Sequence, residues 1–212
     1  RNIVSNGGIF NFNFLFGEIS EELMPFDART FFASKQRFEV VATNCRTGMA
    51  EYFEKGKEPE IMRASAASSS MPVVSSMIRL NGNSYLDGGI AEPIAYKRAM
   101  EQGYEKIVLV LTRQPGYQKP STSKALKLTY ERRYRKYPRL VERLIAVPEH
   151  YNAEQKEIAA LEAEGKVFVI RPQKPVNISR VEKDVVRLRR LYNEGCDEMR
   201  KRMEEMYRYL EL

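Results

Sequence analysis

A continuous apolar run, Ile107–Leu111 (IVLVL), constrains the fold more than any other feature of the 212-residue sequence. A strand of this composition has no polar face and is typical of parallel sheets that are covered on both faces. Segments with helical spacing follow it, and then a second apolar run, Val167–Ile170. Strands that alternate with helices favour an α/β fold with a mainly parallel central sheet flanked by helices.

Two further segments have the composition of strands. Phe38–Asn44 is rich in β-branched residues and largely uncharged, which predicts a buried strand. Ile78–Leu86 predicts a hairpin, because apolar residues flank the turn signal Asn81-Gly82-Asn83-Ser84. The resulting sheet would be thin, so we expect further strands from a segment that precedes Arg1.

Helices are predicted over much of the remaining chain. Pro93–Gln102 has a proline in its first turn, and Gly103 follows at the position of a left-handed C-cap. Later helical segments are expected to be punctuated by Pro138 and Pro148 and to stop at Gly165.

Two more helices are predicted after the second apolar run. Ser179–Glu182 (SRVE) has the pattern of a capping box, which opens a helix. The apolar stripe of this helix is Val181, Val185, Leu188 and Tyr192. A last helix carries one face made of Met199, Met203, Met206, Tyr207 and Leu210.

The charge divides the chain into two parts. Residues 1–118 hold 13 basic and 13 acidic side chains, whereas residues 119–212 hold 22 and 15. The whole net charge of +7 therefore belongs to the second part. We predict two regions, a neutral α/β region over residues 1–118 and a basic, mostly helical region with one short strand over residues 119–212.

The counts of reactive residues exclude several classes of protein. Cys45 and Cys196 are far apart in sequence and His150 is the single histidine, so zinc sites, iron–sulfur centres and disulfide frameworks are not expected. The sequence has no G-x-x-x-x-G-K-[ST] or G-x-G-x-x-G motif, and we predict neither a cofactor nor a metal. No apolar run approaches the roughly 20 residues of a membrane span. The expected location is the cytoplasm, with at most a peripheral contact with the membrane.

Three short patterns carry weaker signals. Ser121-Thr-Ser-Lys124 matches the S-x-x-K pattern of penicillin-binding enzymes, but a serine there is also a natural N-cap for a following helix. Asn177-Ile-Ser179 is a glycosylation sequon without a secretory signal. A Ser-His-Asp triad would have to use His150, whose charged surroundings predict an exposed residue near a helix start.

The distinctive stretch of the chain is Arg63–Ala91, which ends in Asp87-Gly88-Gly89. An aspartate beside two glycines at the carboxyl end of a strand lies where ligands bind in open α/β sheets. The glycines permit a tight turn and leave space above the carboxylate. The alternative is a loop in which Asp87 is an ordinary turn residue.

The order of these motifs resembles the patatin-like phospholipases. The elements are R-A-S…P-V-V, then Y-L-D-G-G, a helix that starts with proline, and an apolar strand. The flanking segments resemble the bacterial cytoplasmic branch of that family, and they are Phe38–Phe53, Gly103–Arg113, Tyr134–Leu140 and Gly165–Pro172. The resemblance extends over nearly the whole chain, and its specificity comes from the ensemble of motifs.

The resemblance implies a lipid acyl hydrolase with a Ser–Asp dyad, in which Asp87 is the general base. A serine hydroxyl needs an adjacent base, and an aspartate with a pKa of about 3.9 needs a dry setting to fill that role. Leu86 and Ile90 flank the motif and are the apolar residues that we expect to supply such a setting.

The family's nucleophile and oxyanion-hole motifs do not occur in these 212 residues. No serine lies in a G-x-S-x-G elbow, and Gly7-Gly8 follows no strand. The serine cluster Ser65–Ser70 lacks the glycine spacing and is interpreted as small-residue packing. We therefore expect that the chain is the C-terminal part of a longer enzyme, that residues 1–118 complete its catalytic domain, and that this part alone is inactive.

The stretch Lys124–Arg143 has eight cations interleaved with Tyr130, Tyr134 and Tyr137. It matches three descriptions: a solvated helix face, a surface for anionic phospholipid headgroups, and a nucleic-acid contact. Because a lipid hydrolase must reach an interface, the membrane is preferred to nucleic acid as a partner. The alternative function for the whole chain is a catalytically silent α/β module that binds an anionic membrane surface or nucleic acid through these helices.

Overall fold

The structure is a computed structural model that describes residues 22–57, 60–179 and 182–211. The chain separates into two compact units. The first contains the described residues up to Ile94 together with Ser121–Pro148, and the second contains Ala95–Pro120 together with the described residues from Glu149 onward. Each unit is described by itself.

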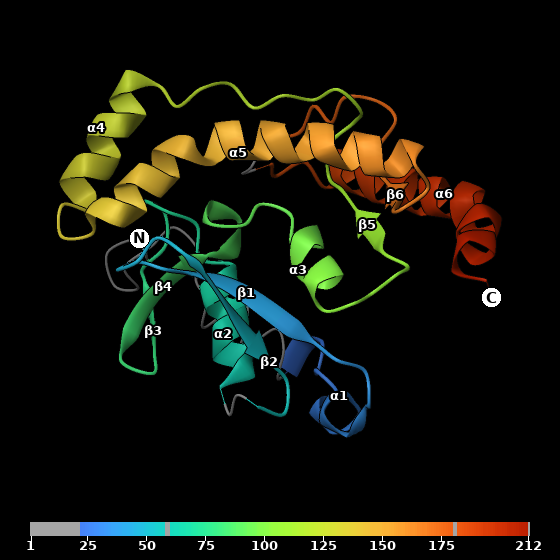
Figure 1. The fold of residues 1–212 in the computed structure, drawn as a ribbon, viewed down its shortest axis with the longest axis horizontal. Coiled ribbons are helices and arrows are strands. Elements are labelled where there is room, and N and C mark those ends of the chain that lie inside the picture. Colours follow the sequence, from blue (N-terminus) through green and yellow to red (C-terminus); the bar gives the residue numbers. More distant parts are fainter. Residues whose placement is uncertain (1–21, 58–59, 180–181, 212) are drawn as a thin grey trace. The chain divides into compact units, whose positions relative to one another are not determined.

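The first unit is built on a four-stranded sheet (Figure 1). Its strands are β1 (Glu39–Asn44), β2 (Ala50–Glu54), β3 (Ile78–Leu80) and β4 (Asn83–Asp87), in the order β2-β1-β4-β3. Every neighbouring pair is antiparallel. The strands predicted at Phe38–Asn44 and in the hairpin Ile78–Leu86 are confirmed, and the hairpin turns at Asn81 and Gly82, both with positive φ. The prediction of a mainly parallel sheet is wrong for this unit.

The antiparallel pairing of β1 with β2 follows from a second hairpin that the sequence analysis missed. β1 and β2 are joined by a short turn that contains Gly48 at φ +70°. Strands joined by such short connections can only be antiparallel, since a parallel pair needs a long crossover. The strand β2 (AEYFE) escaped notice because its two glutamates interrupt the apolar pattern.

Helices cover both faces of this sheet. On one face, α2 (Ile61–Ser68) packs through Ile61, Ala64 and Ala67. The sheet residues in that core are Val40, Ala42, Phe53, Leu80 and Tyr85. The core of the other face joins Cys45, Leu86 and Ile90 to Tyr134, Leu140 and Leu144. These last two residues belong to the start of α5 (Pro138–Ala163). The first unit also contains α1 (Ala28–Ala33) and α4 (Lys124–Arg133).

The second unit contains the one parallel pair in the described part of the chain. β5 (Val108–Val110) and β6 (Phe168–Ile170) pair with Val108 opposite Phe168 and Val110 opposite Ile170. These are the two apolar runs that the sequence predicted as parallel strands. The expectation that the first is covered on both faces is wrong among the described residues, because Val110 is 74 % exposed. The remaining elements of this unit are α3 (Tyr96–Glu101), the later part of α5, and α6 (Val185–Leu210).

Several predicted helix boundaries differ from the structure. Pro93 precedes α3, which begins at Tyr96, although Gly103 has the expected positive φ of 82°. Pro148 lies inside α5 and does not end it, whereas Pro138 opens that helix.

The predicted capping box does not begin a helix. Asp184 is the N-cap of α6, because its Oδ1 accepts hydrogen bonds from the backbone N–H groups of Val186 (2.9 Å) and Arg187 (3.3 Å). The two helices predicted in this region are a single helix, and Val181 lies outside the described residues.

Candidate functional site

The Asp87-Gly88-Gly89 motif lies where β4 ends and one turn of 3-10 helix, Gly88–Ile90, begins. Asp87 is half-buried and caps this turn, because its Oδ1 accepts a hydrogen bond from the Gly89 N–H at 2.8 Å. The carboxylate is therefore held in one orientation at the carboxyl end of a strand. The structure places Asp87 as the sequence predicted, at a strand end and in a turn.

The space around the first glycine requires it, and the space around the second is tight. A Cβ on Gly88 would lie 2.2 Å from the carbonyl oxygen of Val41, which is far inside van der Waals contact. A Cβ on Gly89 would lie 3.2 Å from Oδ1 of Asp87 itself. Gly88 thus lets β1 approach the turn closely, and Gly89 leaves room beside the carboxylate.

Thr43 holds the two ends of this turn together, and the sequence analysis did not identify it. Its hydroxyl donates to the carbonyl oxygen of Asp87 at 2.7 Å and accepts from the Ala91 N–H at 3.1 Å. The side chain is fully buried in β1. A fully buried hydroxyl needs partners, and here they are backbone groups on both sides of the motif.

The serine cluster contacts the motif through its backbone. The N–H of Asp87 donates to the carbonyl oxygen of Ser70 at 2.9 Å. The hydroxyls of Ser65, Ser69 and Ser70 donate to carbonyl oxygens one helical turn earlier. This arrangement agrees with the interpretation of the cluster as packing, since small side chains let α2 lie close to the sheet.

The segment after the serine cluster has a strained backbone. Val73 has a φ of +72°, which is unusual for a β-branched residue. Its N–H donates to the phenolic oxygen of Tyr134 at 2.7 Å, and Tyr134 is 4 % exposed. A residue of the basic stretch therefore fixes the chain just beyond the serine cluster.

A polar network lies in the same sheet and was also missed. Nδ2 of Asn44 donates to Glu51 Oε1 at 2.7 Å, and its Oδ1 accepts from the N–H groups of Arg46 and Thr47 at 2.9 and 3.3 Å. The phenol of Tyr85 donates to the other oxygen of Glu51. Burial and this hydrogen bond raise the pKa of Tyr85 to about 12.

The remaining candidate residues have structural positions. Burial raises the pKa of the Cys45 thiol to about 12, so it is not a thiolate nucleophile near neutral pH. Ser123, inside the S-x-x-K pattern, caps α4 through a 3.3 Å hydrogen bond from the Leu126 N–H. His150 is half-buried inside α5, so the prediction of an exposed residue near a helix start is wrong. Asn177 is exposed, and Gly7-Gly8 lies outside the described residues.

The basic stretch Lys124–Arg143 separates its cations from its aromatic rings. Tyr134 is buried, and Tyr130 and Tyr137 pack partly buried against the same core. Seven of the eight cations are exposed, and the half-buried Arg143 donates to the carbonyl oxygen of Ala91. No residue of α4 is buried, and its Leu126 and Leu128 are 38 % and 48 % exposed. The helix thus presents cations and two leucines to solvent.

The described part of the chain holds no group of three or more histidine, cysteine, aspartate or glutamate side chains that are placed to bind a metal ion. Among its helices, none combines the length and the apolar content that a membrane crossing requires.

The comparison with protein families gives one match. Residues 137–211 match a family described only as "Domain of unknown function (DUF6363)". The match covers less than half of the chain, includes all of α5 and α6, and does not include the Asp87 turn. No curated protein matches the chain.

Proposed function

We propose that this chain supplies the aspartate of a lipid acyl hydrolase that works through a Ser–Asp dyad. The observation that carries the proposal is the turn at Asp87. The Gly89 N–H holds the carboxylate at the end of the strand, and the turn has no room for a side chain at Gly88. The resemblance of the surrounding motifs to the patatin-like phospholipases supports the same role.

The proposed reaction uses Asp87 as a general base. Its carboxylate takes the proton of a serine hydroxyl while the serine oxygen attacks the carbonyl carbon of an acyl ester. The tetrahedral intermediate collapses, the C–O bond to the alcohol breaks, and protonated Asp87 returns the proton to the departing alcohol. Water, deprotonated by Asp87, then hydrolyses the acyl-serine and restores both residues.

The surroundings of Asp87 suit this role in one respect and differ from expectation in another. Ile90 is 3 % exposed and Leu86 is fully buried, so apolar side chains do flank the turn. Leu86, however, pairs with Thr43 and Asp87 pairs with Ala42, and successive residues of a strand point to opposite faces. Leu86 therefore packs on the opposite face of the sheet from the Asp87 side chain, in the core that also contains Ile90.

The nucleophile and the oxyanion hole are proposed to come from outside these 212 residues, because the sequence has no G-x-S-x-G elbow. The chain alone is then inactive. The proposed setting is the cytoplasmic surface of a membrane, where the acyl ester of a lipid is the substrate.

The test is ester hydrolysis by the full-length gene product and by the 212-residue chain. In the full-length protein, Asp87→Asn is expected to lower kcat for a p-nitrophenyl acyl ester by about 10⁴. The asparagine oxygen can still accept from the Gly89 N–H, so the thermal unfolding temperature should be unchanged. Asp197→Asn, an exposed residue paired with Arg200 on α6, is the matched control. Full activity in Asp87→Asn would overturn the dyad, and hydrolysis by the chain alone that Asp87→Asn abolishes would overturn the outside nucleophile.

A second candidate function is binding to an anionic membrane surface, and the exposure of α4 favours it. Cations near such a surface contribute roughly 1 kcal/mol each, and Leu126 and Leu128 are exposed on the same helix. The test is co-sedimentation with vesicles of phosphatidylcholine, with or without phosphatidylglycerol.

The triple variant Lys127→Gln/Arg132→Gln/Arg133→Gln is expected to bind the anionic vesicles about a hundredfold more weakly. The control variant Lys166→Gln/Lys174→Gln/Lys183→Gln loses the same charge from exposed positions elsewhere and should bind like the parent. Equal binding to neutral and anionic vesicles would contradict the proposal. Stronger binding to a single-stranded oligonucleotide than to vesicles would assign the helix to nucleic acid.

A further inference from the structure

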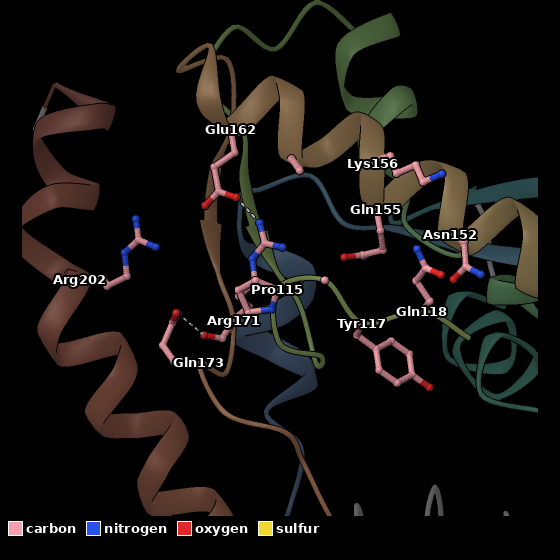
Figure 2. Close-up of a pocket in the computed structure, with 12 residues that line it drawn as sticks. Pro115, Tyr117, Gln118, Asn152, Gln155, Lys156, Glu162, Arg171, Gln173 and Arg202 are labelled. Carbon is pink, nitrogen blue, oxygen red and sulfur yellow. Dashed lines mark hydrogen bonds and ion pairs between the residues drawn. The ribbon is translucent and has the colours of Figure 1, made fainter. Parts of the chain in front are cut away.

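A cavity of about 270 Å³ lies at the carboxyl ends of the parallel strands in the second unit (Figure 2). The loop after β5 forms one wall with Pro115–Gln118, and Arg171 and Gln173, which follow β6, form another. Side chains of α5 and α6 form the rest of the lining, and the cavity is open to solvent on one side. In open α/β sheets, ligands bind outside the carboxyl ends of parallel strands. The volume is close to the lower end of the range for small-molecule sites, about 300 Å³.

One face of α5 lines the cavity, and its side chains fix the loop. Asn152, Gln155 and Glu162 extend from the helix on the same side in Figure 2. The amide of Asn152 accepts from the N–H of Lys119 at 2.8 Å and donates to its carbonyl oxygen at 3.0 Å. The ring of Tyr117 packs edge-on against Tyr151, with 6.1 Å between centroids. The loop after β5 is thus anchored at Tyr117 and at Lys119.

The lining carries an excess of positive charge. Its cations are Lys156, Arg171 and Arg202, and Glu162 is its one anion. The guanidinium of Arg202 lies 4.5 Å from the centroid of the Phe168 ring and donates to the carbonyl oxygen of Val169 at 2.9 Å. It also pairs with Glu205 at 3.1 Å, a carboxylate outside the cavity lining, so backbone, ring and ion-pair contacts hold it at the cavity.

Arg171 is the unusual member of this set. Its side chain is 6 % exposed, and among the described residues its guanidinium pairs with one carboxylate, that of Glu162, through one nitrogen. A guanidinium carries five N–H donors, and a buried one needs acceptors for most of them. The pair with Glu162 leaves most of these donors available to another oxygen-bearing group.

Gln155 gives a second, independent indication of a ligand. The residue is 9 % exposed, lines the cavity, and its Nε2 has no hydrogen-bond acceptor among the described residues. A buried amide donor without an acceptor is costly, and such groups in native proteins ordinarily meet a ligand, water or ion.

We propose that this cavity binds a small molecule through a carboxylate or phosphate group, which accepts hydrogen bonds from Arg171 and from Nε2 of Gln155 beside the positive charge of Arg202. Arginine suits both groups, because its donors match two oxygens of a carboxylate or a phosphate. The site is separate from the Asp87 turn and does not depend on the proposed hydrolase activity. Most of its lining residues belong to the segment that matches the family of unknown function.

The test measures binding of two probes, inorganic phosphate and succinate, to the whole chain by calorimetry at constant ionic strength. At least one probe is expected to bind with one-to-one stoichiometry and to raise the thermal unfolding temperature. Binding of only one probe identifies which of the two groups the cavity accepts.

Three variants locate the binding. Gln155→Leu keeps the side-chain size, removes the donor, and is expected to weaken binding by about tenfold to a hundredfold while the free chain becomes no less stable. Arg202→Gln tests the positive charge without removing the buried Arg171. Lys166→Gln, an exposed residue outside the cavity lining, is the control for the loss of one charge.

Two results would overturn the inference. The first is that neither probe binds more strongly than chloride does. The second is that Gln155→Leu and Arg202→Gln bind phosphate as tightly as Lys166→Gln does, because that would mean diffuse attraction to a chain with a net charge of +7.

Discussion

Side chains gather at strand ends in two places in this chain, and the two places are built differently. At the end of β4, backbone atoms define the geometry, because Gly88 has no room for a side chain beside Val41 and Thr43 bonds only to backbone groups. At the ends of β5 and β6, side chains define it, because Arg171 pairs with Glu162 and the loop is anchored by Asn152.

This difference has a chemical consequence. A turn fixed by the backbone positions one carboxylate in one way, which suits a group that must meet a reacting atom. A cavity lined by side chains can change its ligand by substitution while its strands stay paired. We expect the first site to tolerate almost no change. Outside the pair that the buried Arg171 makes with Glu162, the second should tolerate changes that alter binding more than folding.

Gly88→Ala is the most severe test of the backbone-defined site. The added Cβ would lie 2.2 Å from the Val41 carbonyl oxygen, so β1 and β4 must move apart, and we expect a loss of about 3 kcal/mol or more in unfolding free energy. Gly195→Ala on α6 meets no atom within 4 Å and should stabilise its helix by up to about 1 kcal/mol. Urea unfolding followed by circular dichroism measures both. A change below about 1 kcal/mol in Gly88→Ala would contradict the idea of a backbone-defined turn.

Glu162→Gln is the corresponding test of the side-chain-defined site. It leaves the guanidinium of Arg171 buried without its carboxylate, and we expect a loss of about 3 kcal/mol. Glu164→Gln breaks only an exposed pair with Lys166 and should cost less than about 1 kcal/mol.

Phosphate should distinguish an anion site from a purely structural ion pair. If the cavity binds oxyanions, added phosphate restores part of the lost stability in Glu162→Gln and stabilises it more than it stabilises the parent chain. The same urea titration, repeated at constant ionic strength with phosphate or chloride, measures this. Equal recovery in both salts would show that Arg171 serves only its ion pair.

Local signals predicted the parts of the fold that depend on neighbouring residues. The turn at Asn81 and Gly82 was predictable because both residues favour the positive φ that a two-residue hairpin needs. The apolar runs around Leu109 and Val169 were predictable as parallel strands because they contain no polar residue, although Val110 is exposed. Asp87 was predictable at a strand end because it follows the apolar residues of the hairpin and precedes two glycines.

The parts that sequence reasoning missed depend on residues that are distant along the chain. In the sequence, Thr43 does not differ from the other β-branched residues of its strand. Its hydrogen bond to the turn forms only because Asp87 lies opposite it in the sheet. The cavity joins Gln155 in α5 to Arg171 after β6 and Arg202 in α6. No local pattern connects these three residues, and a lone glutamine in a charged helix predicts exposure.

Tyr134→Phe tests how far the backbone-defined region extends beyond the turn. Removing the hydroxyl takes away the acceptor for the N–H of Val73, whose backbone is already strained, and we expect a loss of about 1–2 kcal/mol. Tyr137→Phe is the matched control, because Tyr137 packs against the same core and its hydroxyl has no hydrogen-bond partner among the described residues. If urea unfolding shows the same loss of stability in both variants, the hydrogen bond from Val73 to Tyr134 contributes nothing to the unfolding free energy.

The smallest expected effect is electrostatic and belongs to the edge of the sheet in the first unit. Hydrogen bonds from Arg37 and Lys57 lower the pKa of Glu54 from its ordinary value of 4.5 to about 2. Because the pKa is lowered in the folded chain, the contribution of the Glu54 carboxylate to stability is complete above pH 4.5 and is lost as the pH falls toward 2. Glu54→Gln should therefore lower the unfolding temperature slightly at neutral pH, and the difference from the parent should shrink in acid.

A double-mutant cycle isolates this effect from the rest of the surface charge. Once Glu54 is glutamine, the further change Arg37→Gln should leave the acid dependence of the unfolding temperature unaltered, whereas Arg37→Gln alone should weaken it. Thermal unfolding of the parent, the two single variants and the double variant, between neutral pH and about pH 3, measures the coupling between Glu54 and Arg37. A constant difference between parent and Glu54→Gln across that range would mean that the carboxylate acts through packing. The edge of this sheet would then depend on contact geometry alone, as the turn at Gly88 does.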